Sequence, residues 1–341
     1  MATRNRDDAF WTTPKVNLVQ CSAASFANKS ARYHRNPFLS PSRIYLGRGR
    51  CLELKQLRLR TVLPNFLIIG AMKSGTSSLH YYLGRHDDIY TPNLKEPGLF
   101  LDYSNEIPIV SSMSANQIKM GLSNDQLLRT LLNGYHGEKM FGESSTFYTK
   151  APYMGSEVPA RLSKLCPDMK FIYLVRNPLA RIVAQYRHHA AVAKQPFNGG
   201  RPVALTQRPF NEELAENPGA YVELSRYFAQ LNHYLRFFPK ASFKVIVFER
   251  FVKNVPATLK NVFEFLGVES RQYDGGNFKV YNEGKQRTRK VFGEIRYSAA
   301  NYVRVMSAVS PDLTELKHFM ADDIPEWDIS AAKWCDFQAN R

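Results

Sequence analysis

The chain has 341 residues, of which 44% are hydrophobic and 13% aromatic, and its formal net charge is +16 at pH 7. This composition can bury one large α/β core or at most two modest ones, so we expect a globular protein. Residues 1–60 hold 12 Lys and Arg against 3 Asp and Glu, so the remainder carries a weak positive bias, and that argues against a nucleic-acid-binding protein.

Residues 1–60 are rich in Ser, Arg and Asn and lack a steady hydrophobic period. They predict a basic N-terminal extension, and residues 61–341 a single domain. An acid-poor Arg/Ser-rich leader also resembles an organelle transit peptide, although Asp7 and Asp8 count against that reading. No apolar run approaches the roughly 20 residues that cross a bilayer, so we expect a soluble, cytoplasmic protein without a transmembrane segment. The four cysteines lie far apart, with no spacing typical of a zinc site or a redox motif.

Short apolar runs and helix-compatible stretches alternate after residue 63. The runs read as buried parallel strands because they show no polar alternation. Strands that alternate with helices predict an α/β fold in which helices flank a parallel sheet. The expected strands are 66–69, 170–175 and 243–248; the expected helices are 76–86, 179–193 and 255–266, with an amphipathic segment at 220–238. The stretch 195–209 has the composition of a loop.

The segment Gly70–Ser78 lies between an expected strand and an expected helix. Glycines let successive N–H groups point inward, and a helix N-terminus adds partial positive charge, so this turn predicts an anion site. The two glycines are five apart, as in the Walker loop of nucleotide-binding proteins, but the lysine lies inside the loop at Lys73 and Thr76 follows the second glycine. A metal-dependent kinase or NTPase is therefore disfavoured.

Residues 64–79 resemble the 5′-phosphosulfate loop of sulfotransferases that use 3′-phosphoadenosine 5′-phosphosulfate (PAPS), particularly the heparan sulfate sulfotransferase-like branch that is also common in bacteria. The resemblance covers about residues 63–330 and implies a P-loop nucleotide-kinase-like fold. It implies PAPS as the donor, with no metal required, and a glycan or small molecule as acceptor. The donor-loop candidates are Lys73, Ser74, Gly75, Thr76, Ser77 and Ser78, and Lys73 is also a catalytic candidate, because an ammonium there would neutralise charge on the leaving phosphate.

Arg176 stands at the end of the strand expected at 170–175, where ligands of α/β proteins bind. The run from Arg176 to Arg181 resembles the family's 3′-phosphate segment, which makes Arg176 a donor-binding candidate. Ala184 occupies the position where the family usually has a phosphate-binding serine. Near the C-terminus, the basic run 284–290 is similar to a family loop that closes over the nucleotide, and Arg287 and Arg289 are its candidates; a solvated charge run is the alternative.

The segment Lys95–Phe100 resembles the one that carries the catalytic base of heparan sulfate sulfotransferases, so Glu96 is the candidate base. Histidine is the base in other branches, but His80, His86 and His136 stand in no recognisable motif.

The segment 141–148 resembles a third family segment, usually Glu-Lys-Ser/Thr-Pro followed by aromatic residues, that lines the reacting centre. It makes Glu143 and Tyr148 substrate-binding candidates. Ser144 replaces the family lysine and Thr146 the proline, so either that lysine is dispensable or Lys139 or Lys150 replaces it.

We therefore predict a PAPS-dependent sulfotransferase that acts on a hydroxyl or amine by in-line transfer. A P-loop-like kinase and an inactive nucleotide-binding scaffold remain the alternatives. The identity of the acceptor and the oligomeric state are left open.

Overall fold

The computed structural model describes residues 43–46, 50–53, 62–101, 123–153, 155–193, 208–270 and 294–335. The chain divides into two compact units, Met1–Val62 and Leu63–Arg341. In the first unit, β1 (Arg43–Leu46) pairs antiparallel with β2 (Arg50–Glu53). The assignment of residues 1–60 to a basic extension stays a prediction.

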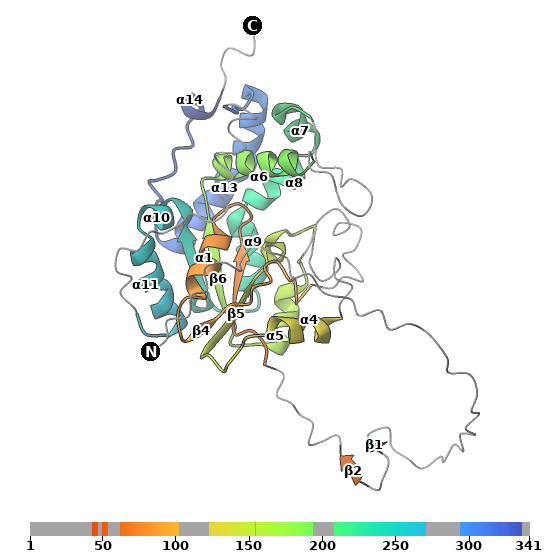
Figure 1. The fold of residues 1–341 in the computed structure, drawn as a ribbon. Coiled ribbons are helices and arrows are strands. Elements are labelled where there is room, and N and C mark those ends of the chain that lie inside the picture. Colours follow the sequence, from red (N-terminus) through yellow and green to blue (C-terminus); the bar gives the residue numbers. More distant parts are fainter. Residues whose placement is uncertain are drawn as a thin grey trace, which may run out of the picture. The chain divides into compact units, whose positions relative to one another are not determined.

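The second unit is built on a five-stranded parallel sheet (Figure 1). Its strand order is β4-β5-β3-β6-β7, with β3 in the middle. The strands are β3 (Phe66–Gly70), β4 (Ile89–Tyr90), β5 (Met140–Ser144), β6 (Lys170–Val175) and β7 (Phe243–Val247). The predicted parallel α/β fold is confirmed, and the three strands expected from the sequence are present.

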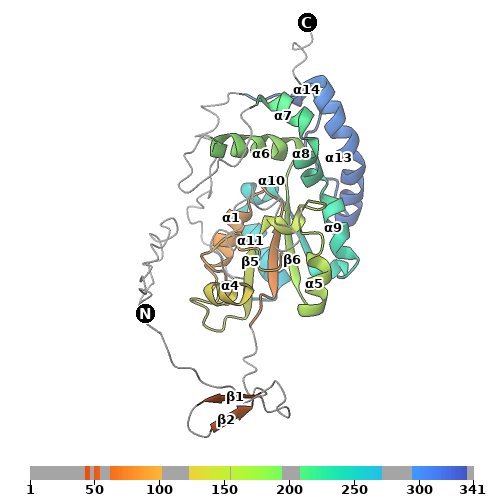
Figure 2. The same cartoon turned by 90° about the vertical axis from the view of Figure 1, so that its right-hand side faces the viewer.

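Helices cover both faces of this sheet, which explains why β3 is apolar at every position. Phe66 and Ile68 pack into one core cluster, with residues of α1 and α11. Leu67 and Ile69 pack into the other, with residues of α5, α9 and α13. Figure 2 shows α9 and α13 on one side of the sheet and α1 on the other.

The described helices of the second unit differ in length, from 4 residues in α14 to 22 residues in α13. Those next to the sheet and the candidate site are α1 (Thr76–Leu83), α5 (Val158–Leu165), α6 (Pro178–Ala193), α9 (Tyr227–Leu235), α10 (Phe248–Lys253), α11 (Val255–Leu266) and α13 (Ala299–Met320). The others are α4 (Asn124–Leu131), α7 (Phe210–Glu216), α8 (Pro218–Val222) and α14 (Ala331–Trp334), with single 3-10 turns η1 (Thr146–Thr149), η2 (Glu223–Ser225) and η3 (Lys240–Ser242). Within the described ranges, no helix is long and apolar enough to span a membrane.

The amphipathic segment expected at 220–238 is broken into α8, η2 and α9. The break falls at Arg226, whose φ of −85° and ψ of 79° lie outside the helical region. The Asp312 carboxylate then accepts hydrogen bonds from the N–H groups of Phe228 (2.9 Å) and Ala229 (2.7 Å). A carboxylate from α13 therefore caps the new helix from outside it, which no local pattern could reveal.

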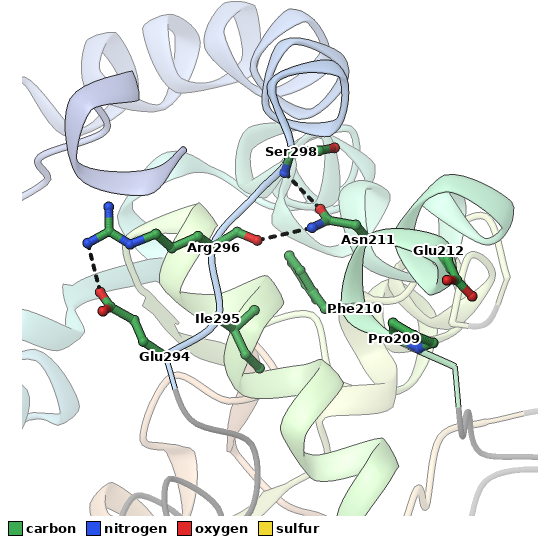
Figure 3. Close-up of a pocket in the computed structure, with 8 residues that line it drawn as sticks. All are labelled: Pro209, Phe210, Asn211, Glu212, Glu294, Ile295, Arg296 and Ser298. Carbon is green, nitrogen blue, oxygen red and sulfur yellow. Dashed lines mark hydrogen bonds and ion pairs between the residues drawn. The ribbon is translucent and has the colours of Figure 1, made fainter. Parts of the chain in front are cut away.

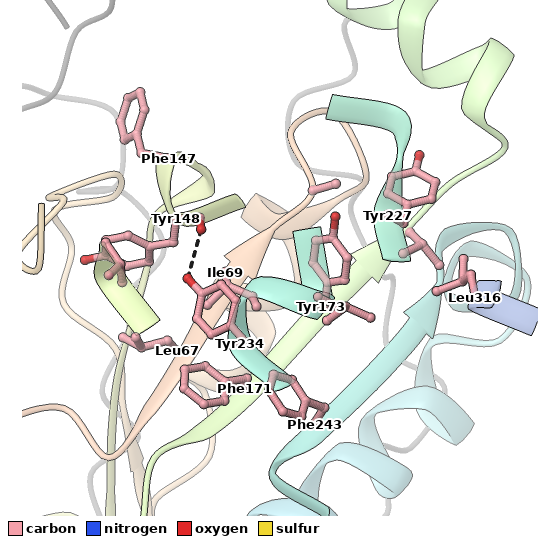
Figure 4. Packing of buried hydrophobic residues seen from close by; sticks show 14 of the residues in the cluster. Leu67, Ile69, Phe147, Tyr148, Phe171, Tyr173, Tyr227, Tyr234, Phe243 and Leu316 are labelled. Carbon is pink, nitrogen blue, oxygen red and sulfur yellow. Dashed lines mark hydrogen bonds between the residues drawn. The ribbon is translucent and has the colours of Figure 1, made fainter. Parts of the chain in front are cut away.

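Aromatic rings fill the core between β6 and α9 (Figure 4). Phe171 of β6 stacks on Phe243 of β7 at 5.0 Å and meets Tyr234 of α9 edge-on at 5.1 Å. The Tyr234 hydroxyl donates a hydrogen bond of 2.8 Å to the Tyr148 carbonyl oxygen. The core packing thus fixes η1, a turn that carries candidate site residues, against α9.

The strand order also locates the place where a ligand is expected. The chain leaves β3 toward β4 and β5 on one side and later returns to place β6 on the other. Parallel α/β sheets bind ligands outside the carboxyl ends of their strands, where the order reverses in this way. In this protein that place is at the ends of β3 and β6, below α6 in the views of Figures 1 and 2.

Candidate active site

The loop after β3 turns sharply into α1. Lys73 and Gly75 have φ values of 68° and 91°, in the left-handed region, and Gly75 is the N-cap residue of α1. A Cβ on Gly75 would lie 2.9 Å from the Phe248 ring, so a larger residue would be both strained and crowded. As a glycine, the N-cap residue has no side chain to cap the first turn of α1. The loop therefore leads directly into a helix N-terminus, which has the geometry of an anion site; the predicted binding of an anion stays a prediction.

Ser74 adds a second sign of a ligand at this loop. Its side chain is fully buried, and its hydroxyl has no hydrogen-bond partner among the described residues. A buried polar group without a partner is destabilising and needs an explanation. A phosphate or sulfate oxygen at the loop would supply the missing hydrogen bond.

Arg176 lies beside this loop because β6 pairs with β3. Its guanidinium donates a hydrogen bond of 3.0 Å to the Lys73 carbonyl oxygen and lies 4.8 Å from the centre of the Phe248 ring. Its Nε has no partner among the described residues. The Tyr227 hydroxyl donates a 2.7 Å bond to the Arg176 carbonyl oxygen and fixes the backbone.

Lys73 and Arg176 carry like charges at neighbouring positions, and this favours binding of an anion. Burial lowers the pKa of Lys73, and the charges of Arg176 and Lys95 lower it further. Burial also lowers the pKa of Arg176. A negatively charged ligand between them would relieve this repulsion and stabilise the charged forms. The residues present therefore fit the phosphate groups of a nucleotide.

Glu96 lies across from the loop, in a left-handed conformation with φ of 57°. One carboxylate oxygen accepts hydrogen bonds from the Thr146 N–H at 2.7 Å and hydroxyl at 3.1 Å, and the other pairs with the Lys95 ammonium. Burial would raise the pKa of Glu96, but Lys95, Lys150 and the Thr146 N–H together hold it below its usual value. The side chain as a whole is 25% exposed.

Glu143 and Tyr148 support the segment that carries Glu96. Both side chains are buried, and Glu143 accepts hydrogen bonds from the hydroxyls of Tyr148 and Ser145. Those hydroxyls in turn accept the N–H groups of Phe100 (3.2 Å) and Gly98 (2.9 Å). Burial raises the pKa of Glu143 to about 7 despite these bonds. The prediction that Glu143 and Tyr148 contact an acceptor stays a prediction.

His80 and Ser144 form a buried pair behind Glu96. His80 Nδ1 lies 2.6 Å from the Ser144 hydroxyl, and its Nε2 lies 3.0 Å from the Pro92 carbonyl oxygen. Since that carbonyl can only accept, Nε2 carries the proton and Nδ1 accepts from Ser144. Burial, with the charge of Lys95, lowers the pKa of His80 to about 4, so this histidine is neutral near pH 7.

The structure adds residues that the sequence did not single out. Lys95 pairs with Glu96 and donates a 3.4 Å hydrogen bond to the Thr76 hydroxyl. On α6, partial burial lowers the pKa of His189 to about 3, and the charges of Lys150 and Lys73 contribute, whereas the neighbouring His188 is exposed. The available signal was position: α6 starts directly after Arg176 and so begins at the same edge of the sheet.

Some of the predicted residues cannot be placed relative to this site. Arg287 and Arg289 lie outside the described residues, and so does most of the stretch 195–209. Ala184 is part of α6. In the described part of the chain, no three His, Cys, Asp or Glu side chains form a group that could hold a metal ion.

A separate pocket of about 540 Å³ lies beside the start of α7 (Figure 3). Its polar groups mostly bond to one another: Asn211 Nδ2 donates to the Arg296 carbonyl oxygen at 3.2 Å, and Arg296 pairs with Glu294 at 3.1 Å. This pocket contains none of the predicted donor-binding or catalytic residues.

Comparison with known proteins settles the family. A family model described as the sulfotransferase family matches residues 64–272, more than half of the chain. The chain belongs to the sulfotransferase family.

Among curated sulfotransferases, heparan sulfate glucosamine 3-O-sulfotransferase 3B1 of Mus musculus is 27% identical over 209 residues, which cover 61% of this chain and 47% of the mouse protein. The membrane-associated sulfotransferase kil1 of Dictyostelium discoideum is 34% identical over 124 residues, or 36% of this chain and 22% of that protein. The chain thus spans about half the length of the mouse relative, or less for kil1. A sulfotransferase crystal structure from Alicyclobacillus acidocaldarius superposes with a TM-score of 0.58 at 25% identity, covering 78% of this chain and 99% of that one. The family resemblance and the sulfotransferase fold are confirmed.

Proposed function

We propose that this domain transfers a sulfuryl group from PAPS to a hydroxyl or amine of a glycan or small-molecule acceptor. The observation that carries the proposal is the meeting, at the ends of β3 and β6, of Lys73, the Arg176 guanidinium and a buried Ser74 hydroxyl that has no partner among the described residues. Membership of the sulfotransferase family supports the choice of donor.

The donor's phosphates would be held by two groups of residues. Lys73, Ser74, Gly75, Thr76, Ser77 and Ser78 would hold the 5′-phosphosulfate through the loop and the start of α1. Arg176 would hold the 3′-phosphate, because its guanidinium can bind two phosphate oxygens at once. We propose that Arg287 and Arg289 add charge from the C-terminal run.

Glu96 and Lys73 would perform the chemistry. When bound, PAPS supplies the sulfuryl group. Glu96 accepts the acceptor's proton as the acceptor oxygen or nitrogen bonds to sulfur. Lys73 neutralises the charge left on the phosphate oxygen when its bond to sulfur breaks. The Glu96 side chain is 25% exposed and its neighbours favour the ionised form, and both observations support the role of base. Neither residue's task calls for a metal ion.

Glu143 and Tyr148 are proposed as residues of the acceptor side. Because both are buried, they would act through the segment from Glu96 to Phe100, whose N–H groups at Gly98 and Phe100 are held by hydroxyls bonded to Glu143. Glu143 would thereby set the position of Glu96 relative to an acceptor.

Two measurements test the proposal. The protein should show a higher melting temperature with 3′-phosphoadenosine 5′-phosphate, the spent donor, because a ligand that binds only the folded state stabilises it. Incubation with PAPS and extracts of the source organism should yield a product heavier by one sulfuryl group. A melting temperature that rises with ATP and Mg²⁺ but not with the spent donor would favour a kinase instead. Donor binding without any sulfated product would favour an inactive scaffold.

A further inference from the structure

Lys150, directly after η1, is a buried cation that the proposed mechanism does not use. Its side chain is only 4% exposed, and its ammonium lies 4.2 Å from the centre of the Phe147 ring. Burying an ammonium is unfavourable unless an anion compensates for the lost hydration. Burial is accordingly the main cause that lowers the pKa of Lys150 to about 8, and the charge of Glu96 opposes that decrease. Lys150 therefore remains mostly protonated at pH 7, with Glu96 as a stabilising anion.

The backbone on both sides of Lys150 is anchored. Before it, the Thr149 hydroxyl donates a 2.8 Å hydrogen bond to the Ile69 carbonyl oxygen at the end of β3. After it, Ala151 exchanges two hydrogen bonds with the Gln230 amide of α9, at 3.0 and 2.8 Å. Such anchoring keeps a long side chain in place at small entropic cost.

The same turn carries two groups that act on Glu96. Thr146 at its start binds the Glu96 carboxylate through its N–H and hydroxyl. Lys150 directly follows this four-residue turn. The opposite charges of Lys150 and the Glu96 carboxylate each favour the charged form of the other.

Within the described part of the chain, three more titratable groups interact with Glu96. Lys95, next to Glu96 in the chain, pairs with it directly. Glu143 of β5 and His80 of α1 are also within electrostatic range. Glu143 opposes ionisation of Glu96 when it is charged, and neutral His80 contributes little. The favourable charges are therefore Lys95 and Lys150.

A second ammonium near Glu96, besides that of Lys95, would help to keep the Glu96 carboxylate ionised. A donor with several negative charges, bound to the neighbouring loop, would favour the protonated form of Glu96 by like-charge repulsion. A protonated Glu96 could not accept the acceptor's proton. Lys139, the other lysine considered for this region, is exposed just before β5 and donates to the Gly267 carbonyl oxygen. It precedes the strand, so it lies at the edge of the sheet opposite to the one where Glu96 lies.

We propose that Lys150 is a positioning residue for the reaction, whose charge keeps the Glu96 carboxylate ionised when the donor is bound. The use of this charge in catalysis rests on the proposed function, whereas the coupling between Lys150 and Glu96 does not. The proposal also assigns a role to the lysine after η1 in a chain where Ser144 occupies the position of the family lysine.

The coupling is measured without any donor. In protein labelled with ¹³C at glutamate side-chain carboxyls, and with the Glu96 signal assigned through Glu96→Gln, the pKa of Glu96 should rise by about 1 in Lys150→Met. Lys150→Arg should leave it near the wild-type value, and the control Lys139→Met should not change it. In the wild-type protein, the Glu96 signal should show a second, smaller inflection near pH 8, where Lys150 loses its proton. An unchanged pKa of Glu96 in folded Lys150→Met overturns the proposal. If that variant does not fold, the absence of the second inflection from the Glu96 signal of the wild-type protein overturns the proposal.

The catalytic use of the charge is read from the pH profile. The acidic limb of kcat/KM should move to higher pH in Lys150→Met by the same amount as the pKa of Glu96, and Lys150→Arg should restore it. A purely structural role would lower activity equally at all pH values, and that outcome overturns the catalytic part. Should the wild-type protein sulfate nothing, the proposed function fails, while the NMR titration still decides on the coupling.

Discussion

The Arg176 guanidinium donates a 3.0 Å hydrogen bond to the Lys73 carbonyl oxygen, so the residues that follow β6 and β3 hold each other in place before any ligand arrives. The bond uses one N–H of the guanidinium, and Nε has no partner among the described residues. Because the bond is made to the backbone, the Lys73 side chain can be replaced without breaking it. This separation allows the two residues to be tested independently.

Arg176→Ala should raise the KM for PAPS far more than it lowers kcat. A 3′-phosphate contact is present in the ground state and the transition state alike, so its loss weakens binding without changing the barrier of the bound complex. Steady-state kinetics at varied donor concentration give both constants. Arg129→Ala, a change at an exposed arginine of α4, is the control and should leave both near wild type. A collapse of kcat with unchanged donor affinity would instead place Arg176 at the reacting centre.

Lys73→Ala and Glu96→Gln should each lower kcat by roughly 10² or more, because both residues act mainly in the transition state. Glu96→Gln should keep most of its affinity for the spent donor. The wild-type rate should be the same in excess EDTA, since neither residue's role involves a divalent cation. Turnover of the identified acceptor measures the kcat of both variants and the effect of EDTA, and the increase in melting temperature with the spent donor measures the affinity of Glu96→Gln. Glu264→Gln, on the exposed face of α11, is the control. Near-normal turnover in Glu96→Gln would move the base elsewhere, and loss of activity in EDTA would contradict the mechanism.

Ser74→Ala should leave the stability of the ligand-free protein unchanged or raise it, because the variant removes a buried hydroxyl that has no partner among the described residues. The same change should reduce the increase in melting temperature caused by 3′-phosphoadenosine 5′-phosphate. Thermal denaturation with and without this ligand measures both effects. A clear loss of stability without ligand would show that the hydroxyl already has a partner in the free protein.

Glu143→Gln should change how stability depends on pH. The pKa of Glu143 is raised to about 7 in the folded protein, from 4.5. The folded state therefore binds more protons than the unfolded state between these values, and this group lowers the free energy of unfolding as pH rises from about 4.5 to 7. Relative to wild type, the variant should gain roughly 3 kcal/mol between pH 4 and pH 8. Denaturant unfolding at both pH values gives the difference; a gap that does not vary with pH would rule out titration of Glu143 in this range.

The sequence predicted those strands and helices that can be recognised from the residue pattern of a single segment. The bounds expected for β6 and α11 match the structure, because an uninterrupted apolar run and an amphipathic stretch of 12 residues are readable without knowing their neighbours. Strand β5 was missed because Met140–Ser144 includes a glycine, a glutamate and a serine. Its glycine is required because a Cβ on Gly142 would lie 2.1 Å from the Phe66 ring of β3, a contact between distant parts of the chain.

The candidate site likewise includes residues that a local pattern predicts and residues that depend on contacts between distant parts of the chain. Lys73 and Arg176 could be predicted because each follows a readable strand. Glu96 depended on the family resemblance, and its link to Lys150 could not be predicted, since it arises only when η1 folds back beside the end of β3. His188 and His189 stand in no recognisable motif, and only the start of α6 directly after Arg176 indicated that they belong near this edge of the sheet.

The position of β3 between β5 and β6 would separate the two proposed tasks of the domain, donor binding and acceptor activation, along the sheet. Arg176 follows β6 on one side, whereas Thr146 and Lys150, which act on Glu96, follow β5 on the other. We therefore expect mutations after β5 to alter which acceptor is used while the Arg176–Lys73 bond stays intact. This arrangement would let acceptor preference diverge among descendants of one gene at little risk to nucleotide binding, and it indicates the turn after β5, residues 145–149, as the segment to vary when a new acceptor is sought.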